Sequence, residues 1–172
     1  MIAFVREVAR SLARCELTFL ARTPIAVPRA QRQHAHYVAE LSALGCRIEW
    51  LPPLAEQPDG VFVEDAAVLV PEVGVVTRPG VASRRDEVES VAAALAQHVA
   101  LRRVTDPACL EGGDVLRIGR TLYVAASGRT QNRAHRSFHG FELHRQDRQQ
   151  LVLHVIQRHV IGHHADAVGF AQ

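Results

Sequence analysis

Apolar and polar positions in the first third of the chain predict two strands separated by one helix. Residues 1–6 form a short apolar run that is typical of a strand. Between Pro28 and Leu44 the apolar side chains recur at steps of three and four residues, which predicts a helix with Gly45 as its natural C-terminal stop. Residues 46–51 alternate apolar and polar side chains and precede two prolines, so we expect a second strand there.

The central stretch predicts a hairpin, a helix and a closing strand. Apolar residues 66–70 and 74–77 flank a turn, and two acids precede the first of these runs. A helix is predicted over residues 83–97, with its first residue, a serine, as N-cap and Asp86 at the capping-box position. Residues 101–104 complete a ββαβ unit as its closing strand.

A second copy of this pattern begins at Leu110. Residues 110–114 again place acids before an apolar strand, at residues 115–118, and a further strand follows at residues 122–125. In both units arginines lie just past the exit of the second strand. Tandem ββαβ units of this kind predict an α/β fold.

The composition changes near Thr130, before the second unit has supplied its helix and closing strand. Seven of the ten histidines follow this point, and only residues 151–161 keep a helix-like apolar stripe. We therefore divide the chain into an N-terminal part, residues 1–130, and a His- and Arg-rich tail, residues 131–172.

The overall composition excludes several classes of protein. The 172 residues are 48% apolar with a formal charge of +2, which suits one globular domain and argues against a nucleic-acid partner. No apolar run approaches the roughly 20 residues that span a bilayer, and an early acid, Glu7, without an apolar h-region argues against a signal peptide. We expect a cytoplasmic protein without a membrane partner, whose cysteines (Cys15, Cys46 and Cys109) are reduced thiols.

Acidic residues near the strands of the two units are candidates for a binding site. They are Asp59, Glu64, Asp65, Glu111 and Asp114. If the units pack around an axis, these carboxylates converge on one face, where they suit a planar guanidinium group, and the arginines suit a substrate carboxylate. The pattern thus predicts a pocket for an arginine-like amino acid. Turn acids and helix-cap partners are the simpler explanation and, on the pattern alone, the favoured one.

Two further candidate sites are weaker. Cys109 lies two residues before Glu111, so on a strand both side chains would point to one face, but a small buried thiol is about ten times more common than a nucleophile there. Tail histidines such as His154 and His159 have a spacing that suits zinc on a helix, but no acid or cysteine joins them. We therefore expect no metal and no cofactor.

Five short motifs follow one another along the N-terminal part. They are residues 15–18 (Cys-Glu-Leu-Thr), 59–65 (Asp-Gly-Val-Phe-Val-Glu-Asp), 77–85 (Thr-Arg-Pro-Gly-Val-Ala-Ser-Arg-Arg), 110–114 (Leu-Glu-Gly-Gly-Asp) and 127–130 (Ser-Gly-Arg-Thr). In this order and spacing they resemble the dimethylarginine dimethylaminohydrolases over about residues 1–130. Several ordered motifs together are a far more specific signal than any one of them.

This resemblance implies a fold and a reaction. The implied fold is a pentein-type α/β propeller of five ββαβ modules, of which this chain would hold about two and a half. The implied reaction is hydrolysis of methylated arginine to citrulline and a methylamine, without a cofactor. In that family a cysteine thiolate attacks the guanidinium carbon and a histidine acts as general acid and base.

The resemblance also implies roles for residues of this chain, with Asp65 and Glu111 in the catalytic machinery. Glu64 and Asp65 would lie at the guanidinium and the pocket floor, Leu17 and Asp59 at the amino end, Arg84 and Arg129 at the α-carboxylate, and Glu111 beside the histidine.

The chain departs from the family pattern after Thr130. The Leu-His-Leu-Lys-like stretch with the histidine and the late nucleophilic cysteine are both missing, and a frameshift near Gln131 is one hypothesis for this change. Three functions stay open: a hydrolase of methylated arginine, an arginine deiminase-like hydrolase, and an inactive guanidino-binding remnant or partner-dependent interaction protein. We expect the chain alone to be inactive and to self-associate through uncovered edges.

Overall fold

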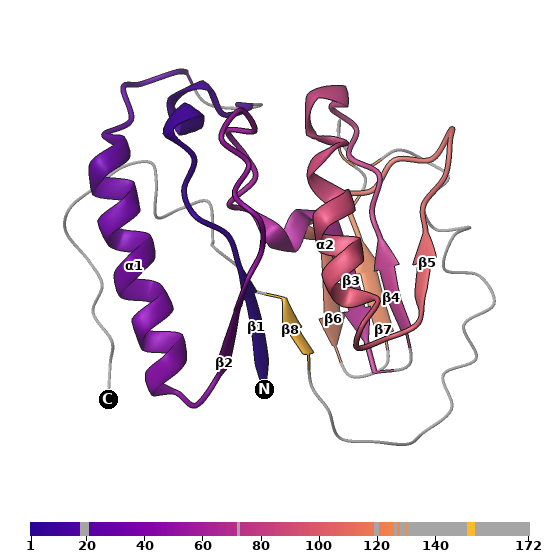
Figure 1. The fold of residues 1–172 in the computed structure, drawn as a ribbon. Helices are drawn as coiled ribbons and strands as arrows, with labels where there is room; N and C mark the ends of the chain where they lie inside the picture. Colours follow the sequence, from indigo (N-terminus) through magenta and orange to yellow (C-terminus); the bar gives the residue numbers. More distant parts are fainter. Residues whose placement is uncertain are drawn as a thin grey trace.

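The computed structural model describes residues 1–17, 21–71, 73–118, 121–125, 127, 130 and 151–153. Within these residues the elements, with η for 3-10 helices, are β1 (Ile2–Val5), η1 (Arg10–Arg14), α1 (Val27–Ala43), β2 (Arg47–Trp50), η2 (Val63–Ala66), β3 (Ala67–Val70), β4 (Val73–Val76), η3 (Ala82–Arg84), α2 (Glu87–Leu95), β5 (Leu101–Arg103), η4 (Gly112–Asp114), β6 (Val115–Ile118), β7 (Thr121–Val124) and β8 (Leu151–Leu153). Figure 1 shows α1 beside β1 and β2, and α2 beside β3, β4 and β5.

The N-terminal strands and helix form as the sequence predicts. β1 and β2 pair in parallel, and α1 connects them. Pro28 lies in the first turn of α1, where its missing N–H leaves no hydrogen bond unmade. The helix ends at Ala43, and Gly45 follows with a φ of 84°, a left-handed conformation that a residue with a Cβ adopts at a cost.

The central ββαβ unit is also confirmed. β3 and β4 form an antiparallel hairpin, α2 follows, and β5 returns parallel to β4. The second hairpin, β6 and β7, is antiparallel as expected. The short 3-10 helices η2 and η4, each directly before a hairpin, were not predicted from the sequence.

Two local predictions are wrong. The predicted N-cap of α2, Ser83, lies in η3, and its hydroxyl donates to Oε1 of Glu16 at 2.9 Å instead of capping a helix. α2 therefore begins at Glu87, after an Asp86 whose side chain makes no cap hydrogen bond. Residues 151–153 form β8, parallel to β1, instead of the start of a helix; the apolar run Leu-Val-Leu suits either structure. The rest of the tail lies outside the described residues.

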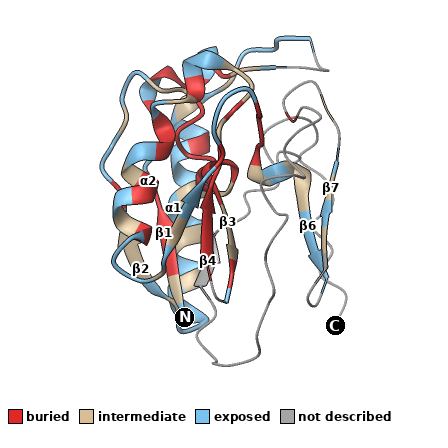
Figure 2. Cartoon of the chain, turned by 90° about the vertical axis from the view of Figure 1, so that its right-hand side faces the viewer, coloured by how far each residue is buried: buried red, intermediate tan, exposed pale blue. Residues whose placement is uncertain are grey.

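The interior contains a hydrophobic core and an unusual buried polar centre. Phe4, Val76 and Leu95 belong to one apolar cluster that joins β1, β4 and α2. Figure 2 shows buried segments in β1 and β4 and exposed ones in β6 and β7. Among the described residues, the two largest fully buried side chains are arginines, Arg6 and Arg84. A buried guanidinium requires hydrogen-bonding and charged partners, so these two residues lead directly to the polar site.

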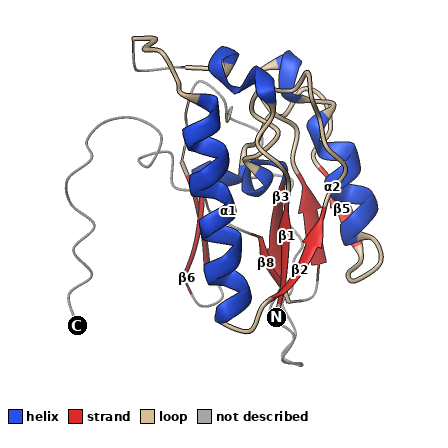
Figure 3. Ribbon diagram, turned by 60° about the vertical axis from the view of Figure 1, so that its left-hand side comes forward, coloured by secondary structure: helices blue, strands red, loops and turns tan. Residues whose placement is uncertain are grey.

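The loops and 3-10 turns gather at one end of the strands, as Figure 3 shows. This end includes the carboxyl end of β1, because the chain begins at the opposite end. Among the described residues no helix is both long and apolar enough to cross a membrane.

Candidate functional site

The acids of the two units lie on two 3-10 turns that touch each other. η2 carries Glu64 and Asp65, and Glu111 immediately precedes η4. The backbone N–H of Gly113 donates to Oδ1 of Asp65 at 3.2 Å. A Cβ on Gly112 would lie 1.9 Å from the carbonyl oxygen of Glu64, so only glycine allows this approach. The Gly-Gly pair of the 110–114 motif thus brings the acids of both units together.

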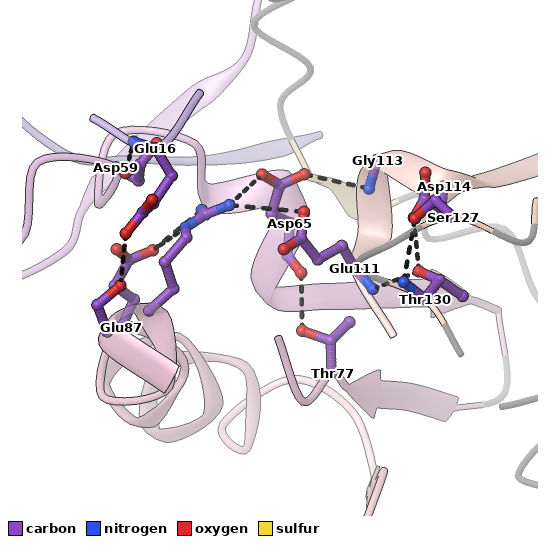
Figure 4. Close-up of polar contacts among 12 residues, drawn as sticks. Glu16, Asp59, Asp65, Thr77, Glu87, Glu111, Gly113, Asp114, Ser127 and Thr130 are labelled. Carbon is purple, nitrogen blue, oxygen red and sulfur yellow. Dashed lines mark hydrogen bonds and ion pairs between the residues drawn. The ribbon is translucent and has the colours of Figure 1, made fainter. Parts of the chain in front are cut away.

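Arg84 lies at the meeting point of these acids. Its Nη1 donates to Oδ2 of Asp65 at 2.8 Å and lies 3.7 Å from Oε2 of Glu111. On its other edge, Nε and Nη2 donate to Oε2 of Glu87 at 3.3 and 3.0 Å. Figure 4 shows the labelled carboxylates Asp65, Glu87 and Glu111 grouped in this way. Charge-assisted hydrogen bonds of this kind are the strong ones in proteins.

Burial and charge shift the pKa values of this pair. Burial alone would lower the pKa of Arg84, but the neighbouring Asp65 and Glu87 outweigh that effect and raise it. Burial raises the pKa of Glu87 to about 7, because Arg84 offsets only part of the desolvation and Asp59 adds a like charge. Arg84 is therefore a permanent cation, whereas Glu87 changes its protonation near neutral pH.

Asp59 joins the site from the loop before η2. Its Oδ2 accepts the backbone N–H of Glu16 at 2.9 Å, and Glu16 in turn accepts from Ser83. Asp59 is also one of the charges that raise the pKa of Arg84. The 15–18 motif, the 59–65 motif and the 77–85 motif therefore meet through these contacts.

Arg6, at the end of β1, ties the Asp59 loop to α2. Its Nη1 donates to the carbonyl oxygen of Gly60 and its Nη2 to Oγ of Ser90, both at 2.6 Å. Burial lowers the pKa of Arg6, and Glu87 opposes that effect. A second buried cation thus acts on Glu87.

The second unit is held by Thr130. Its Oγ1 accepts the backbone N–H of Glu111 at 3.1 Å and donates to Oδ2 of Asp114. Ser127 also donates to Asp114, at 2.7 Å. The end of the 127–130 motif therefore fixes the backbone next to Glu111.

The structure brings together four of the predicted site residues. Asp59, Asp65, Glu111 and Arg84 are between 1% and 4% exposed and surround one point. Glu64 is half-buried beside them, and Leu17 lies on an exposed segment. Arg129 lies outside the described residues, and the individual roles of all these residues stay predictions.

Sequence reasoning missed two members of the polar centre, Glu87 and Arg6. Glu87 has a usable signal, since an acid three residues after Arg84 can reach it across one turn. Arg6 has a weaker one, because an arginine directly after an apolar strand reads as a surface residue.

The arrangement has the chemistry of a cation site with an internal counter-ion. Asp65, Glu87 and Glu111 pair with Arg84, and Asp59 acts on it through its charge, so acidic groups outnumber the arginine that they share. Among the described residues no group of three or more histidine, cysteine, aspartate or glutamate side chains is placed to hold a metal ion.

The three cysteines, all among the described residues, form no disulfide. Cys109, the candidate nucleophile, accepts a hydrogen bond from Nη1 of Arg78 at 3.1 Å. Arg78 also bonds the carbonyl oxygen of Ala108 and Asp106. The thiol is therefore buried as part of an arginine-centred loop contact, in agreement with the structural explanation for it.

Comparison with known proteins identifies relatives of this arrangement. No family model matches the chain. The N(G),N(G)-dimethylarginine dimethylaminohydrolase of Streptomyces coelicolor is 40% identical over 129 residues, 74% of this chain and 50% of that protein. The protein of the same name from Pseudomonas aeruginosa is 32% identical over 132 residues, 74% of this chain and 52% of that protein. The chain therefore spans about half the length of these curated relatives.

Solved structures show the same relationship. A dimethylarginine dimethylaminohydrolase adduct with S-methyl-L-thiocitrulline matches with a TM-score of 0.75 and 31% identity, over 80% of this chain and 55% of that one. A mutant of the P. aeruginosa enzyme complexed with citrulline gives the same values. A cyanobacterial arginine dihydrolase domain, 18% identical with a TM-score of 0.71 over 80% of this chain and 54% of that one, shares the fold. The α/β fold of ββαβ modules is thus confirmed, and in sequence and structure the chain matches the N-terminal part of the dimethylarginine dimethylaminohydrolases.

Proposed function

We propose that the acids around Arg84 form part of a binding site for methylated arginine or its product citrulline. The observation that carries this proposal is the convergence of buried Asp59, Asp65 and Glu111 from two units. An excess of carboxylates favours a planar cation, whose N–H groups donate paired hydrogen bonds to them. The relatives' names and the citrulline complex of one of them point to the same class of ligand.

Within this proposal each residue keeps the role that the family resemblance implies. Asp65 and Glu64 bind the guanidinium, Asp59 and Leu17 the amino end, Arg84 and Arg129 the α-carboxylate, and Glu111 faces the catalytic histidine. Arg84 fits its role chemically. Three of its N–H groups donate to Asp65 and Glu87, and a guanidinium has five. Within the described residues the other two N–H groups of Arg84 make no hydrogen bond, so they are left for a ligand carboxylate.

The activity proposed for the family is hydrolysis of dimethylarginine to citrulline and dimethylamine. For this chain alone we propose binding without turnover. The family's histidine and late cysteine motifs are absent from the sequence, and Cys109 is engaged with Arg78. Without an activated thiolate the guanidinium carbon has no nucleophile, and positioning alone does not replace it.

We further propose a cytoplasmic location and self-association. Free thiols agree with a reducing compartment. Leu116, Ile118 and Tyr123 on the β6–β7 hairpin are more than half exposed. Leu116 and Tyr123 pair directly across the two strands, so they form a contiguous apolar surface that association would cover.

Two assays test the proposal. Purified protein is incubated with asymmetric dimethylarginine and, separately, with arginine, and citrulline is measured. Calorimetric titration with citrulline and with methylarginine then measures binding. We expect binding and no citrulline. Release of citrulline from either substrate would contradict the inactivity, and the preferred substrate would separate a dimethylarginine hydrolase from an arginine deiminase-like enzyme. Absence of binding would contradict the site itself.

A further inference from the structure

Glu87 is the first residue of α2, and its carboxylate accepts two hydrogen bonds from one edge of the Arg84 guanidinium. Its Oε2 accepts both Nε–H, at 3.3 Å, and Nη2–H, at 3.0 Å. Both side chains are almost fully buried, with exposed fractions of 4% and 1%. The Arg84 guanidinium donates two hydrogen bonds from this edge, so it cannot turn without breaking both of them.

These two hydrogen bonds to Glu87 set the orientation of the rest of the Arg84 guanidinium. With Nε and Nη2 on Glu87, Nη1 faces Asp65 at 2.8 Å and Glu111 at 3.7 Å. The N–H groups that remain are on Nη1 and Nη2, away from the Nε edge. Glu87 therefore fixes the direction in which Arg84 offers hydrogen bonds to a ligand.

Helix α2, which begins at Glu87, is held by a second buried arginine. Ser90, one turn along α2, accepts a hydrogen bond from Arg6, which also holds the carbonyl oxygen of Gly60 next to Asp59. The position of α2, and with it Glu87, is thus tied to the loop that carries Asp59. Arg6 thus joins the loop of Asp59, proposed to bind the amino end of the ligand, to the helix whose first residue orients Arg84.

We propose that Glu87 is a positioning residue that orients Arg84 toward the α-carboxylate of an amino-acid ligand, so that the site distinguishes arginine-type amino acids from decarboxylated amines. This inference rests on the ligand site proposed above. It adds Glu87, a residue outside the five motifs, which acts on the ligand only through Arg84.

Glu87 also has an ordinary structural explanation, because an acid in the first turn of a helix interacts favourably with the helix dipole. Glu89 lies in the same first turn and supplies the matched control. Glu89 is exposed, and its ion pair is with Arg103 instead of Arg84. Neutralising Glu89 removes a similar dipole interaction and leaves the Arg84 contacts intact.

The experiment compares the wild type with Glu87→Gln and Glu89→Gln in calorimetric titrations with arginine and with agmatine, which is arginine without its carboxylate. Loss of one charged hydrogen-bonding partner corresponds to about tenfold in affinity. We expect Glu87→Gln to bind arginine about tenfold more weakly and agmatine unchanged, while Glu89→Gln matches the wild type for both. Weakening of both ligands in equal measure, or of neither, would overturn the proposal.

A second measurement does not depend on ligand. In isotope-labelled protein the Nε–H resonance of Arg84, assigned by its loss in Arg84→Lys, reports the contact with Glu87. We expect slow exchange with water in the wild type and in Glu89→Gln, and fast exchange in Glu87→Gln, with the backbone spectrum retained. If this holds while the wild type binds neither arginine nor agmatine, the ligand site fails and the orientation of Arg84 by Glu87 stands. An unchanged Arg84 resonance in Glu87→Gln overturns the positioning role.

Discussion

Nη1 of Arg84 lies 2.8 Å from Oδ2 of Asp65, and this buried ion pair joins the helix side of the first unit to its acidic turn. Asp65 is the residue expected to meet a ligand's guanidinium, and in this structure a guanidinium of the chain itself contacts it. The same Nη1 approaches Glu111 of the second unit. One arginine therefore supplies the positive charge that allows acids from two units to share a buried space.

Replacing Arg84 by methionine should destabilise the fold strongly. The change leaves Asp65, Glu87 and Glu111 buried without their cation, and breaking a buried pair in this way costs about 3–5 kcal/mol. Chemical denaturation measures the change in the free energy of unfolding. Arg103→Met is the control, because Arg103 pairs with Glu89 at the surface, where such pairs contribute about 0–1 kcal/mol. Equal effects of the two substitutions would contradict the assignment of Arg84 as the central counter-ion.

The stability of the wild type should depend on pH through Glu87. Its pKa is raised by burial from an ordinary value of 4.5 to about 7, so between these values the folded state binds the proton more tightly than the unfolded state. Stability from this group is therefore present at low pH and falls as pH rises toward 7. The groups around it are Arg84, Arg6 and Asp59, with Asp65 on the other side of Arg84.

Glu87→Gln removes this titration and isolates it from that of the neighbouring groups. We expect the melting temperature of the wild type minus that of Glu87→Gln to decrease from pH 5 to about pH 7 and to level off above it. The same difference for Glu89→Gln should show no decrease over this range, since the hydrogen bond from Arg103 lowers the pKa of that exposed group. A pH-independent difference for Glu87→Gln would show that its carboxyl group keeps an ordinary pKa.

Gly112→Ala should disrupt the contact between the two acidic turns. The new methyl group would lie 1.9 Å from the carbonyl oxygen of Glu64, and two backbone segments would have to separate. Overpacking costs about 1–3 kcal/mol and occasionally more, and a clash between two backbone segments should lie at the upper end of this range or above it. Gly45→Ala is the control: its Cβ meets nothing within 4 Å, so only its φ of 84° opposes the change, at about 1–2 kcal/mol. Denaturant midpoints that rank the two variants the other way would contradict the close packing of η2 and η4.

Asp59→Asn should weaken binding of amino-acid ligands more than it weakens the fold. Asparagine keeps an oxygen that accepts the N–H of Glu16 but loses the charge that attracts an ammonium group. Affinity for citrulline should fall about tenfold, as expected for one lost charged contact. Asp106→Asn, at an exposed position, is the control and should bind as the wild type does. Unchanged affinity in Asp59→Asn would remove this residue from the ligand site.

Polar substitutions on the β6–β7 hairpin should reduce self-association. Leu116→Gln combined with Tyr123→Gln removes two exposed apolar side chains that pair across the hairpin. Light scattering after size-exclusion chromatography measures the mass. The control, Leu44→Gln, removes an even more exposed leucine at the end of α1. We expect the double variant to shift toward monomer and the control to match the wild type; a monomeric wild type would contradict the proposal.

The strands and the long helix were predictable because each follows from a local signal. Gly45 follows the end of α1 as predicted, and the predicted runs 66–70 and 74–77 agree with β3 and β4 to within one residue at each end. The start of α2 was not predictable in this way, because Ser83 has a tertiary partner, Glu16, that is 67 residues away in the sequence. A capping preference is local, and a contact between distant motifs overrode it.

The site was predictable as a set of residues but not as an arrangement. The motifs indicated Asp59, Asp65, Arg84 and Glu111, and the structure places them around one point. The sequence did not reveal that Arg84 bonds Asp65 directly, since side chains 19 residues apart have no fixed relation until the turns pack. The contribution of Glu87 was hidden for the same reason.

The polar centre has a consequence for local opening of the molecule. Arg6 and Arg84 are the largest fully buried side chains among the described residues, and Asp59 and Pro79 belong to the same fully buried group as Phe4 and Leu95. Asp59 and Arg84, two of the groups proposed to recognise a ligand, are therefore part of the interior. Amides around η2 should exchange with solvent only when the protein unfolds globally, which makes this region one of its most slowly exchanging segments.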